Sequence, residues 1–401
     1  GYGSLPSWLL NNPTANNDTL FIQVTPYTHP TATDSCEGIP FIYQIVVNPS
    51  PQVDLSAAND TICSGDASQV VTLSSATNNA IITWTAVDVP AGSVIGFTTN
   101  SGTTTIPSET LTNNGTVPVY VEYTVKITTL GGLCNGGTRK YYVVVNPTPK
   151  VTFNPATQTI CSGSSTAAIT ISSTTPNTTI SWTCTPPSGI SGAQSSGTGS
   201  TIPAQTLVNS TSAPITVYYV AEAVTSVGLC PGKKDSAAVI VNPIPLAIAN
   251  PISDTICSAT STNIALTSDV TGATFTWSSV LGDSISLVPT TGSGVTISQT
   301  LTNNGTDLDS VVYTITPRAN NCDGLPIDVT VYVQPIPKVT FSAPNQVLCD
   351  SSTTSAITLS STVSNVVYSW SLNANGITGF TTTSGAGTIP SETIYLPANS
   401  T

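Results

Sequence analysis

Cysteine is the residue type whose number and spacing could do chemistry in this chain, and that chemistry is disulfide formation. The chain has 401 residues and nine cysteines, eight of which recur at regular intervals. These eight are Cys36, Cys63, Cys134, Cys161, Cys230, Cys257, Cys322 and Cys349. No two cysteines lie within four residues of each other, and His29 is the one histidine, so the ligand spacing of known metal sites is absent. We therefore expect structural disulfides and no cofactor.

The remaining polar residues do not form a catalytic group. His29 lies in a Thr/Pro-rich stretch, and the other repeat units have no histidine. The twenty acidic residues are scattered. Glu109 and Glu392 occupy equivalent positions, where Gln205 and Gln299 stand in other units. An exchange of Glu for Gln keeps hydrogen bonds and removes charge, which indicates a structural role. We expect that the chain is not an enzyme.

Two further patterns could bind ions. Asp307, Asp309 and Asp323 are candidates for a weak calcium site in one unit only. The glycine-rich stretches 197–199 and 292–294 could contact phosphate, but no helix follows them. We expect these stretches to be loops.

A repeat of about 95 residues organises the chain. A Pro-x-Pro element begins at Pro49, Pro147, Pro243 and Pro335. After each element come a first cysteine and a tryptophan about 21 residues later, and a second cysteine closes the unit. We expect the tryptophans to lie in hydrophobic cores. They are Trp84, Trp182, Trp277 and Trp370.

The repeat predicts three whole modules and two partial ones. The whole modules are residues 51–148, 149–244 and 245–336. Residues 1–50 resemble the C-terminal part of a module, and residues 337–401 the N-terminal part. Because the chain begins and ends in mid-module, we expect it to be a segment of a longer array.

Within each unit the hydrophobic pattern is that of strands. Val121, Tyr123 and Val125 alternate with Glu122 and Thr124, which is the period of a half-buried strand. Short β-branched runs separated by Gly, Asn, Pro and Ser clusters, with one central Trp, are typical of an Ig-like β-sandwich. We predict an all-β, tandem array of Ig-like modules, and the short Pro-x-Pro joints predict a fairly stiff one.

Three disulfide pairings fit the repeat. The first joins the two cysteines that flank one Pro-x-Pro joint, as in Cys134–Cys161, and the second joins the two cysteines of one module, as in Cys161–Cys230. The third joins Cys63–Cys230 and Cys161–Cys322, linking each module to the next, and leaves the other cysteines to partners outside the chain. In an Ig sandwich the first cysteine lies at the end where the chain leaves, next to the second cysteine of the following module. Topology favours this third pairing and leaves the second open. Cys184 lies outside the repeat, and we expect it to be a buried free thiol.

Composition excludes several partners. Charged residues make up 7% of the chain, hydrophobic residues 39%, and the net charge is -12. The eight basic residues form no patch for phosphates, so we expect no nucleic acid partner. No apolar run is long enough to span a bilayer, so we expect no membrane insertion. Cysteine usage indicates an oxidising compartment, and we expect the protein to be extracellular.

The elements Thr-Ile-Cys-Ser-Gly, Thr-Leu-Thr-Asn-Asn-Gly and Val-Asn-Pro-x-Pro, with the Trp and the late Cys, resemble the PKD-like/Ig-like repeats of very large Bacteroidetes surface proteins. That family includes gliding-motility adhesins and other cargo of the type IX secretion system. The resemblance implies export to the cell surface and O-glycans on Ser or Thr after Asp. The matching positions are Thr19, Thr61, Ser236, Thr255, Ser284 and Ser310.

Three functions remain open at this point. The first is the structural shaft of a bacterial surface fibre, filament or adhesin, with copies of itself or neighbouring modules as partners. The second is a glycan-binding array, but Tyr141 and Tyr142 have no aromatic counterparts at 236–238 in the next unit. The third is a spacer in a secreted polysaccharide-degrading protein. The interchangeable cores and joints favour the shaft.

Overall fold

The strands form where β-branched and aromatic residues alternate with polar ones. The computed structural model describes residues 4–28, 35–99, 104–129 and 134–396. In it, the run around Tyr123 forms β12 (Val119–Thr129), with alternate side chains buried. The same pattern forms β22 (Ile215–Thr225) and β33 (Asp309–Ala319). The described residues contain no helix, so the all-β prediction is confirmed.

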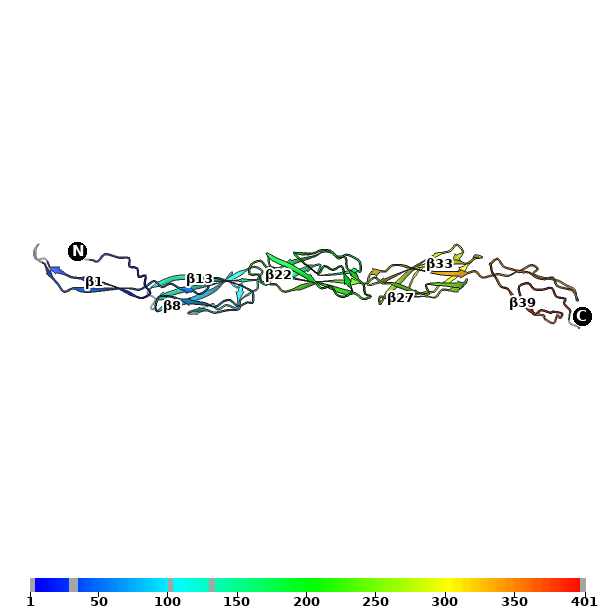
Figure 1. Cartoon of the computed structure of the whole chain (residues 1–401), viewed down its shortest axis with the longest axis horizontal. Helices are drawn as coiled ribbons and strands as arrows, with labels where there is room; N and C mark the ends of the chain where they lie inside the picture. The colour runs from blue at the N-terminus through cyan, green and yellow to red at the C-terminus, as the bar shows by residue number, and fades with distance from the viewer. Residues whose placement is uncertain (1–3, 29–34, 100–103, 130–133, 397–401) are drawn as a thin grey trace.

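Three sandwiches follow one another along the chain, each around its own hydrophobic core. We call them the first, second and third sandwich, with cores that span Val53–Val145, Val151–Val241 and Ala247–Val333. They lie end to end, so the chain is long and narrow (Figure 1). The prediction of tandem Ig-like modules is confirmed.

The first sandwich packs a sheet of order β6-β13-β12-β8 on a sheet of order β10-β7-β5, and β11 pairs with β9. Besides β12, its strands are β5 (Asp54–Leu55), β6 (Asp60–Cys63), β7 (Val71–Ser74), β8 (Ala80–Val89), β9 (Val94–Ile95), β10 (Thr105–Ile106), β11 (Thr112–Asn113) and β13 (Asn135–Asn146).

The second sandwich has the same plan, with sheets β15-β23-β22-β17-β19 and β14-β16-β20 and the pair β18-β21. Its other strands are β14 (Val151–Asn154), β15 (Thr157–Cys161), β16 (Ile169–Ser173), β17 (Thr178–Cys184), β18 (Ile190–Ser191), β19 (Ser196–Thr198), β20 (Thr201–Ile202), β21 (Val208–Asn209) and β23 (Asp235–Asn242).

The third sandwich repeats this plan. Its sheets have the orders β25-β35-β33-β28-β30, β24-β27-β31 and β26-β32-β29, and β34 pairs with β33. Its other strands are β24 (Ala247–Asn250), β25 (Ser253–Cys257), β26 (Thr260–Ser261), β27 (Ile264–Ser268), β28 (Thr274–Leu281), β29 (Ile285–Ser286), β30 (Thr291–Ser293), β31 (Thr296–Ile297), β32 (Thr300–Asn303), β34 (Cys322–Asp323) and β35 (Ile327–Gln334).

The two terminal parts form less sheet than the sandwiches. The N-terminal part has a hairpin of β1 (Asp18–Val24) and β4 (Phe41–Val47) and the short pair β2 (Tyr27–Thr28) and β3 (Cys36–Glu37). The C-terminal part has the two-stranded sheets β36 (Thr340–Phe341) with β37 (Leu359–Ser360) and β38 (Ser369–Ser371) with β39 (Ser384–Ala386). The division of the chain into three whole and two partial modules, with its boundaries, stays a prediction.

Each whole sandwich has one parallel strand pair that is important for the joints. β6 pairs with β13, β15 with β23, and β25 with β35, all in parallel. In each pair the first strand ends in a cysteine opposite the end of the last strand, so that Cys161 lies opposite Asn242. The first cysteine of every sandwich is therefore held at the end where the chain leaves for the next module.

A tryptophan and a tyrosine meet at the centre of each core. The ring centroids are 5.6 Å apart for Trp84 and Tyr123, 5.9 Å for Trp182 and Tyr219, and 5.7 Å for Trp277 and Tyr313, all in edge-to-face geometry. Such pairs contribute about 0.5–1.5 kcal/mol beyond the burial of their area. In each sandwich the tryptophan thus lies against the middle of the long neighbouring strand that carries the tyrosine, which is β12, β22 or β33.

Buried tyrosines make the sandwiches sensitive to alkali. Burial raises the pKa of Tyr219 from 10.0 to about 12, and it also raises the pKa of Tyr313 to about 12. Because the neutral phenol is favoured in the folded state, its contribution to stability is complete below pH 10 and is lost as the pH rises towards 12.

We therefore expect the second sandwich to lose stability in that alkaline window, and Tyr219→Phe to move its unfolding transition to higher pH. Amide exchange in β22, measured against pH with the free thiols blocked, checks this. An unchanged transition in the Phe variant would contradict it.

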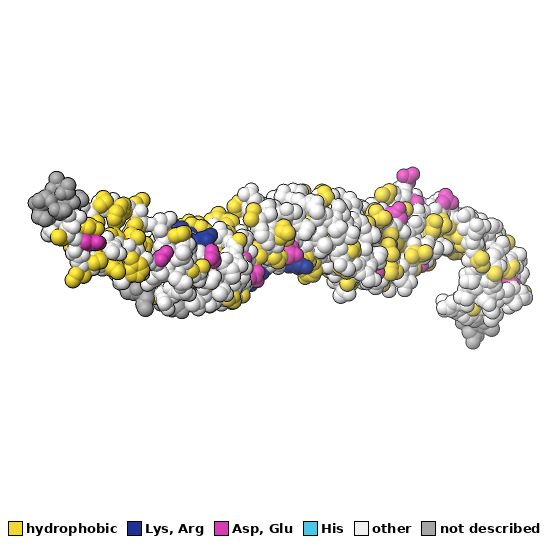
Figure 2. Space-filling view, turned by 60° about the vertical axis from the view of Figure 1, so that its left-hand side comes forward, with side chains coloured by type: hydrophobic (Ala, Val, Ile, Leu, Met, Phe, Trp, Pro, Cys, Tyr) yellow, Lys and Arg dark blue, Asp and Glu magenta, His cyan; other side chains and the backbone are white. Residues whose placement is uncertain are grey.

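The surface carries few charges, as the composition indicates. Figure 2 shows scattered Lys, Arg, Asp and Glu side chains between larger uncharged areas on the face in view. Glu122 forms an ion pair with Lys140 at 2.7 Å, and Asp323 forms one with Arg318 at 2.6 Å. Exposed pairs of this kind contribute at most about 1 kcal/mol. The array is therefore held together by its cores and joints rather than by surface ion pairs.

Candidate functional site at the module joints

Both joints between the sandwiches carry a disulfide. Cys63 is bonded to Cys230, with Cα atoms 5.4 Å apart, and Cys161 is bonded to Cys322, with Cα atoms 5.6 Å apart. The bonded residues are 167 and 161 positions apart in the sequence. This is the pairing that links each module to the next. Neither the pairing within one module nor the pairing across a single Pro-x-Pro joint occurs among the described residues.

Backbone hydrogen bonds place the first cysteine of the second joint. β15 runs parallel to β23 and ends at Cys161, and the amide of Ser162 donates to the carbonyl of Asn242 at 2.8 Å. The hydroxyl of Ser162 accepts from the amide of Asn209 at 2.9 Å and donates to its carbonyl at 3.2 Å. The Cys-Ser element is thus tied to two separate strands before the sulfur reaches across the joint.

Asn209 completes this anchor with its side chain. Its Nδ2 donates to the carbonyls of Ala213 and Val241 at 2.8 and 2.9 Å, and its Oδ1 accepts from the amide of Thr211 at 2.9 Å. A buried amide with three partners holds one backbone arrangement, because any other would leave polar atoms unpaired. In the other modules whose described residues include this segment, the asparagines that make the same three contacts are Asn12, Asn113 and Asn303.

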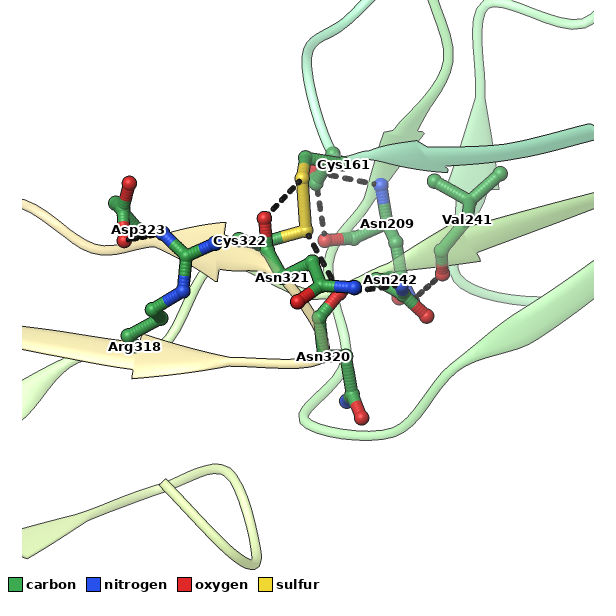
Figure 3. Close-up of a disulfide and its surroundings, with 10 residues drawn as sticks. Cys161, Asn209, Val241, Asn242, Arg318, Asn320, Asn321, Cys322 and Asp323 are labelled. Carbon is green, nitrogen blue, oxygen red and sulfur yellow. Dashed lines mark hydrogen bonds and ion pairs between the residues drawn. A yellow bond between two sulfur atoms is a disulfide. The ribbon is translucent and has the colours of Figure 1, made fainter. Parts of the chain in front are cut away.

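The second cysteine, Cys322, is the first residue of β34 and directly follows the turn that joins β33 to β34. Asn320 and Asn321 adopt φ values of 50° and 64°, a left-handed conformation that Asn tolerates better than most residues. The Nδ2 of Asn242 donates across the joint to the carbonyl of Asn320 at 3.0 Å. Figure 3 shows the Cys161–Cys322 bond beside this contact, with the Arg318–Asp323 ion pair on the far side.

A glycine two residues after the second cysteine lets the turn approach the joint. A Cβ on Gly324 would collide with the carbonyl oxygen of Pro245, the second proline of the Pro-x-Pro element. Gly136 faces Pro51 in the same way, and Gly232 faces Pro149. The Cys-x-Gly element also occurs at Cys36. Sequence reasoning missed this element, although its recurrence in four units was a visible signal.

We expect Gly324→Val to displace the turn and reduce formation of the Cys161–Cys322 bond, at a cost of about 1–3 kcal/mol for the crowded contact. Peptide mapping without reductant measures the bonded fraction. The Cys63–Cys230 bond of the same chain is the internal control and should form fully. Full formation of both bonds would show that the glycine is not needed for the approach.

The other repeat cysteines have no disulfide partner within the described residues. Cys36, Cys257 and Cys349 are exposed, and Cys134 is half-buried. Their role as disulfide cysteines therefore stays a prediction. Cys184 is buried in β17, and burial raises the pKa of its thiol, which keeps it neutral. The structure thus places Cys184 inside a core rather than at a joint.

The tryptophans differ between the sandwiches and the C-terminal part. Trp84, Trp182 and Trp277 are buried core residues. Trp370 is only half-buried, beside a cavity of about 280 Å³ that Phe380 and Ile389 also line. Among the described residues no long hairpin packs over Trp370, and its assignment to a core stays a prediction.

The glycine-rich stretches are not loops, which corrects the sequence-based expectation. Gly197 lies in β19 opposite Trp182, and Gly292 lies in β30 opposite Trp277. A Cβ on either glycine would collide with the indole ring. The glycines are needed because the strand lies flat on the tryptophan. The stretches turn only at Gly199 and Gly294, where φ is positive.

Several of the residues considered for catalysis and metal binding make hydrogen bonds within the fold. Glu109 accepts a hydrogen bond from the Tyr123 hydroxyl at 2.7 Å, and Gln205 accepts the equivalent bond from Tyr219 at 2.9 Å. Asp309 accepts from the amides of Ser284 and Ser310. Within the described ranges no group of three His, Cys, Asp or Glu side chains could hold a metal ion. His29 lies outside the described residues.

The six candidate glycosylation positions lie on different surfaces. Thr61, Ser236 and Thr255 are exposed, whereas Thr19, Ser284 and Ser310 are half-buried. In five of the six, the amide of the Ser or Thr donates to the carboxylate of the preceding Asp, as at Thr61 and Asp60 with 2.8 Å. Ser284 differs, because its amide donates to Asp309. The exposed positions stay the best candidates.

Comparison with known proteins gives a family and distant structural likeness. The family model of a PKD-like domain matches residues 60–149, 158–245 and 254–337. No curated protein matches the chain.

Similar solved structures include mouse cadherin-23 EC22-24, at 12% identity, a TM-score of 0.38, and coverage of 72% of this chain and 99% of that one. The protocadherin GammaB4 extracellular domain matches at 11% identity, a TM-score of 0.37, and coverage of 95% and 67%. Titin domains I67-I69 match at 12% identity, a TM-score of 0.37, and coverage of 71% and 98%. Among the described residues, no helix is long and apolar enough to cross a membrane.

Proposed function

Because the chain belongs to the PKD-like domain family, we propose that it is the structural shaft of an extracellular bacterial surface fibre, filament or adhesin. The observation that carries this proposal is the disulfide across each of the two joints between whole sandwiches. A disulfide at a joint fixes the separation of the two modules at that point, so it limits how far they can bend apart. A shaft needs that property at every joint, and an enzyme domain does not.

The proposed partners are copies of the chain or neighbouring modules, at the cell surface. The resemblance to Bacteroidetes repeats supports export as cargo of the type IX secretion system. O-glycans at Thr61, Ser236 and Thr255 would cover a surface that has few charges. Mass spectrometry of peptides from the native protein tests this last point, since bare peptides at all three positions would refute it.

The main alternative is a spacer or glycan-binding array of a secreted polysaccharide-degrading protein. A pair of tyrosines on the outer face of the first sandwich supports it. Tyr120 and Tyr142 pack edge to face there, with ring centroids 5.5 Å apart. At the positions equivalent to Tyr120 and Tyr142, the second sandwich has Thr216 and Ala238, and the third has Ser310 and Thr330. A repeated glycan platform would need aromatics in each module, so this pair favours the alternative only weakly.

Negative-stain electron microscopy of the native protein shed from cells separates the two functions. The shaft predicts straight fibres of uniform width, many modules long. Short flexible strings that end in one larger globule would support the spacer and contradict the shaft. Purified polysaccharides added to the same sample would cluster the strings if the modules bind glycans.

A further inference from the structure

We propose that the two disulfides splice separate segments of the chain into two continuous covalent strands that carry tension along the array past the folded cores. The segments are the stretches from the second cysteine of one module to the first cysteine of the next. We call them crossing segments, because each passes through one joint. All four have the same length, and they are 36–63, 134–161, 230–257 and 322–349.

A crossing segment runs in one direction along the array. The segment 230–257 consists of β23, the Pro-x-Pro joint, β24 and β25. β23 is parallel to β15 in the second sandwich, and β25 is parallel to β35 in the third. The segment therefore starts at the end of the second sandwich that faces the first sandwich, and it finishes at the end of the third sandwich that faces the C-terminal part. It covers two sandwiches in a nearly extended conformation.

The disulfides join these segments end to end. Cys63–Cys230 joins segment 36–63 to segment 230–257, and Cys161–Cys322 joins segment 134–161 to segment 322–349. The two spliced strands are staggered by one module. Each joint between whole sandwiches is therefore crossed by the backbone of one strand and by the disulfide of the other.

The spliced route is much shorter than the backbone. From Cys36 to Cys257 it contains only two crossing segments and the Cys63–Cys230 bond, whereas the backbone also passes through everything between Cys63 and Cys230. At about 3.5 Å per residue, the spliced route extends to about 190 Å and the backbone to about 770 Å. Because the shorter route limits the separation of its ends, unfolding of the sandwiches cannot stretch this part of the array beyond the shorter length.

The two strands are also hydrogen-bonded side by side. β15 belongs to one of the two spliced strands and β23 to the other. These two β-strands pair from Thr157–Ala238 to Cys161–Asn242. Tension that acted on the two strands in opposite directions would load all these bonds at once. The inference deepens the shaft role proposed above, but it rests on connectivity and its test needs no fibre.

Single-molecule pulling on the 401-residue chain tests the proposal, with handles attached through non-natural amino acids at Gln52 and Ile252, both exposed. With Cys63–Cys230 intact, the shortest covalent route between the handles runs from Gln52 through the disulfide to Ile252. The separation of the handles therefore reaches a limit of about 120 Å. Reductant opens the whole backbone between the handles, which extends to about 700 Å, a roughly six-fold increase.

Two double variants provide the matched controls. Cys63→Ser with Cys230→Ser should extend to about 630 Å without reductant, since the remaining Cys161–Cys322 bond shortens the route between the handles only slightly. Cys161→Ser with Cys322→Ser should keep the limit of about 120 Å. At full extension these lengths depend only on which disulfides have formed, so peptide mapping of each variant first confirms that its remaining bond is present. Extension of the unreduced native chain to several hundred ångströms, or equal lengths for the two variants, would overturn the proposal.

Discussion

Replacing Trp182 by alanine lowers the free energy of unfolding of the second sandwich by about 3–5 kcal/mol. The indole is 2% exposed, packs edge to face on Tyr219 with centroids 5.9 Å apart, and lies flat against Gly197. Since a glycine has no side chain to move into the space, the cavity stays largely open. Hydrogen exchange of amides in β17 and β22 measures the loss.

The effect should stay within one sandwich, because the three cores share no residues. Amides of β33 therefore serve as the control within the same molecule. Trp370→Ala is the matched control in another module, with an expected loss of about 1 kcal/mol because Trp370 is only half-buried. Equal losses for the two variants would mean that burial of the tryptophan does not stabilise the sandwich.

Replacing Cys161 and Cys322 together by serine frees the joint between the second and third sandwiches. A native disulfide of this kind stabilises by about 2–5 kcal/mol, whereas the remaining Asn242–Asn320 hydrogen bond contributes about 1 kcal/mol. The distribution of bend angles at this joint should therefore broaden. The joint with Cys63–Cys230 keeps its bond and should not change.

Electron microscopy of single particles, sorted by the angle at each joint, measures both distributions in one sample. A third variant, Cys184→Ser, removes a buried thiol that takes part in no joint and controls for the loss of a sulfur. Unchanged angles in the double variant would show that the proline joint alone holds the modules in line, and the disulfide would then have no role in stiffness.

Much of this fold was predictable because it repeats. The alternation around Tyr123 predicts β12, and the spacing of cysteine to tryptophan identifies Trp84, Trp182 and Trp277 without any structure. The topology of an Ig sandwich also favours a bond from Cys161 to the next module, because it places that residue at the outgoing end. Local pattern and known topology were sufficient for these features.

Contacts between residues distant in the sequence were not predictable in this way. The approach of Gly324 to Pro245 and the bond from Asn209 to Val241 depend on how loops from different strands meet at a joint. The sequence shows that both residue types recur, but not what they contact. Gly197 was assigned to a loop for the same reason, since its packing on Trp182 depends on strand pairing.

Peptide mapping of the unreduced native protein tests the central claim, that each module is bonded to the next. The free thiols are first blocked at acidic pH, so that no exchange occurs during digestion. The structure predicts linked peptides that contain Cys63 with Cys230 and Cys161 with Cys322. A linked peptide of Cys161 with Cys230, or of Cys134 with Cys161, would contradict the stapled joints and the spliced strands together.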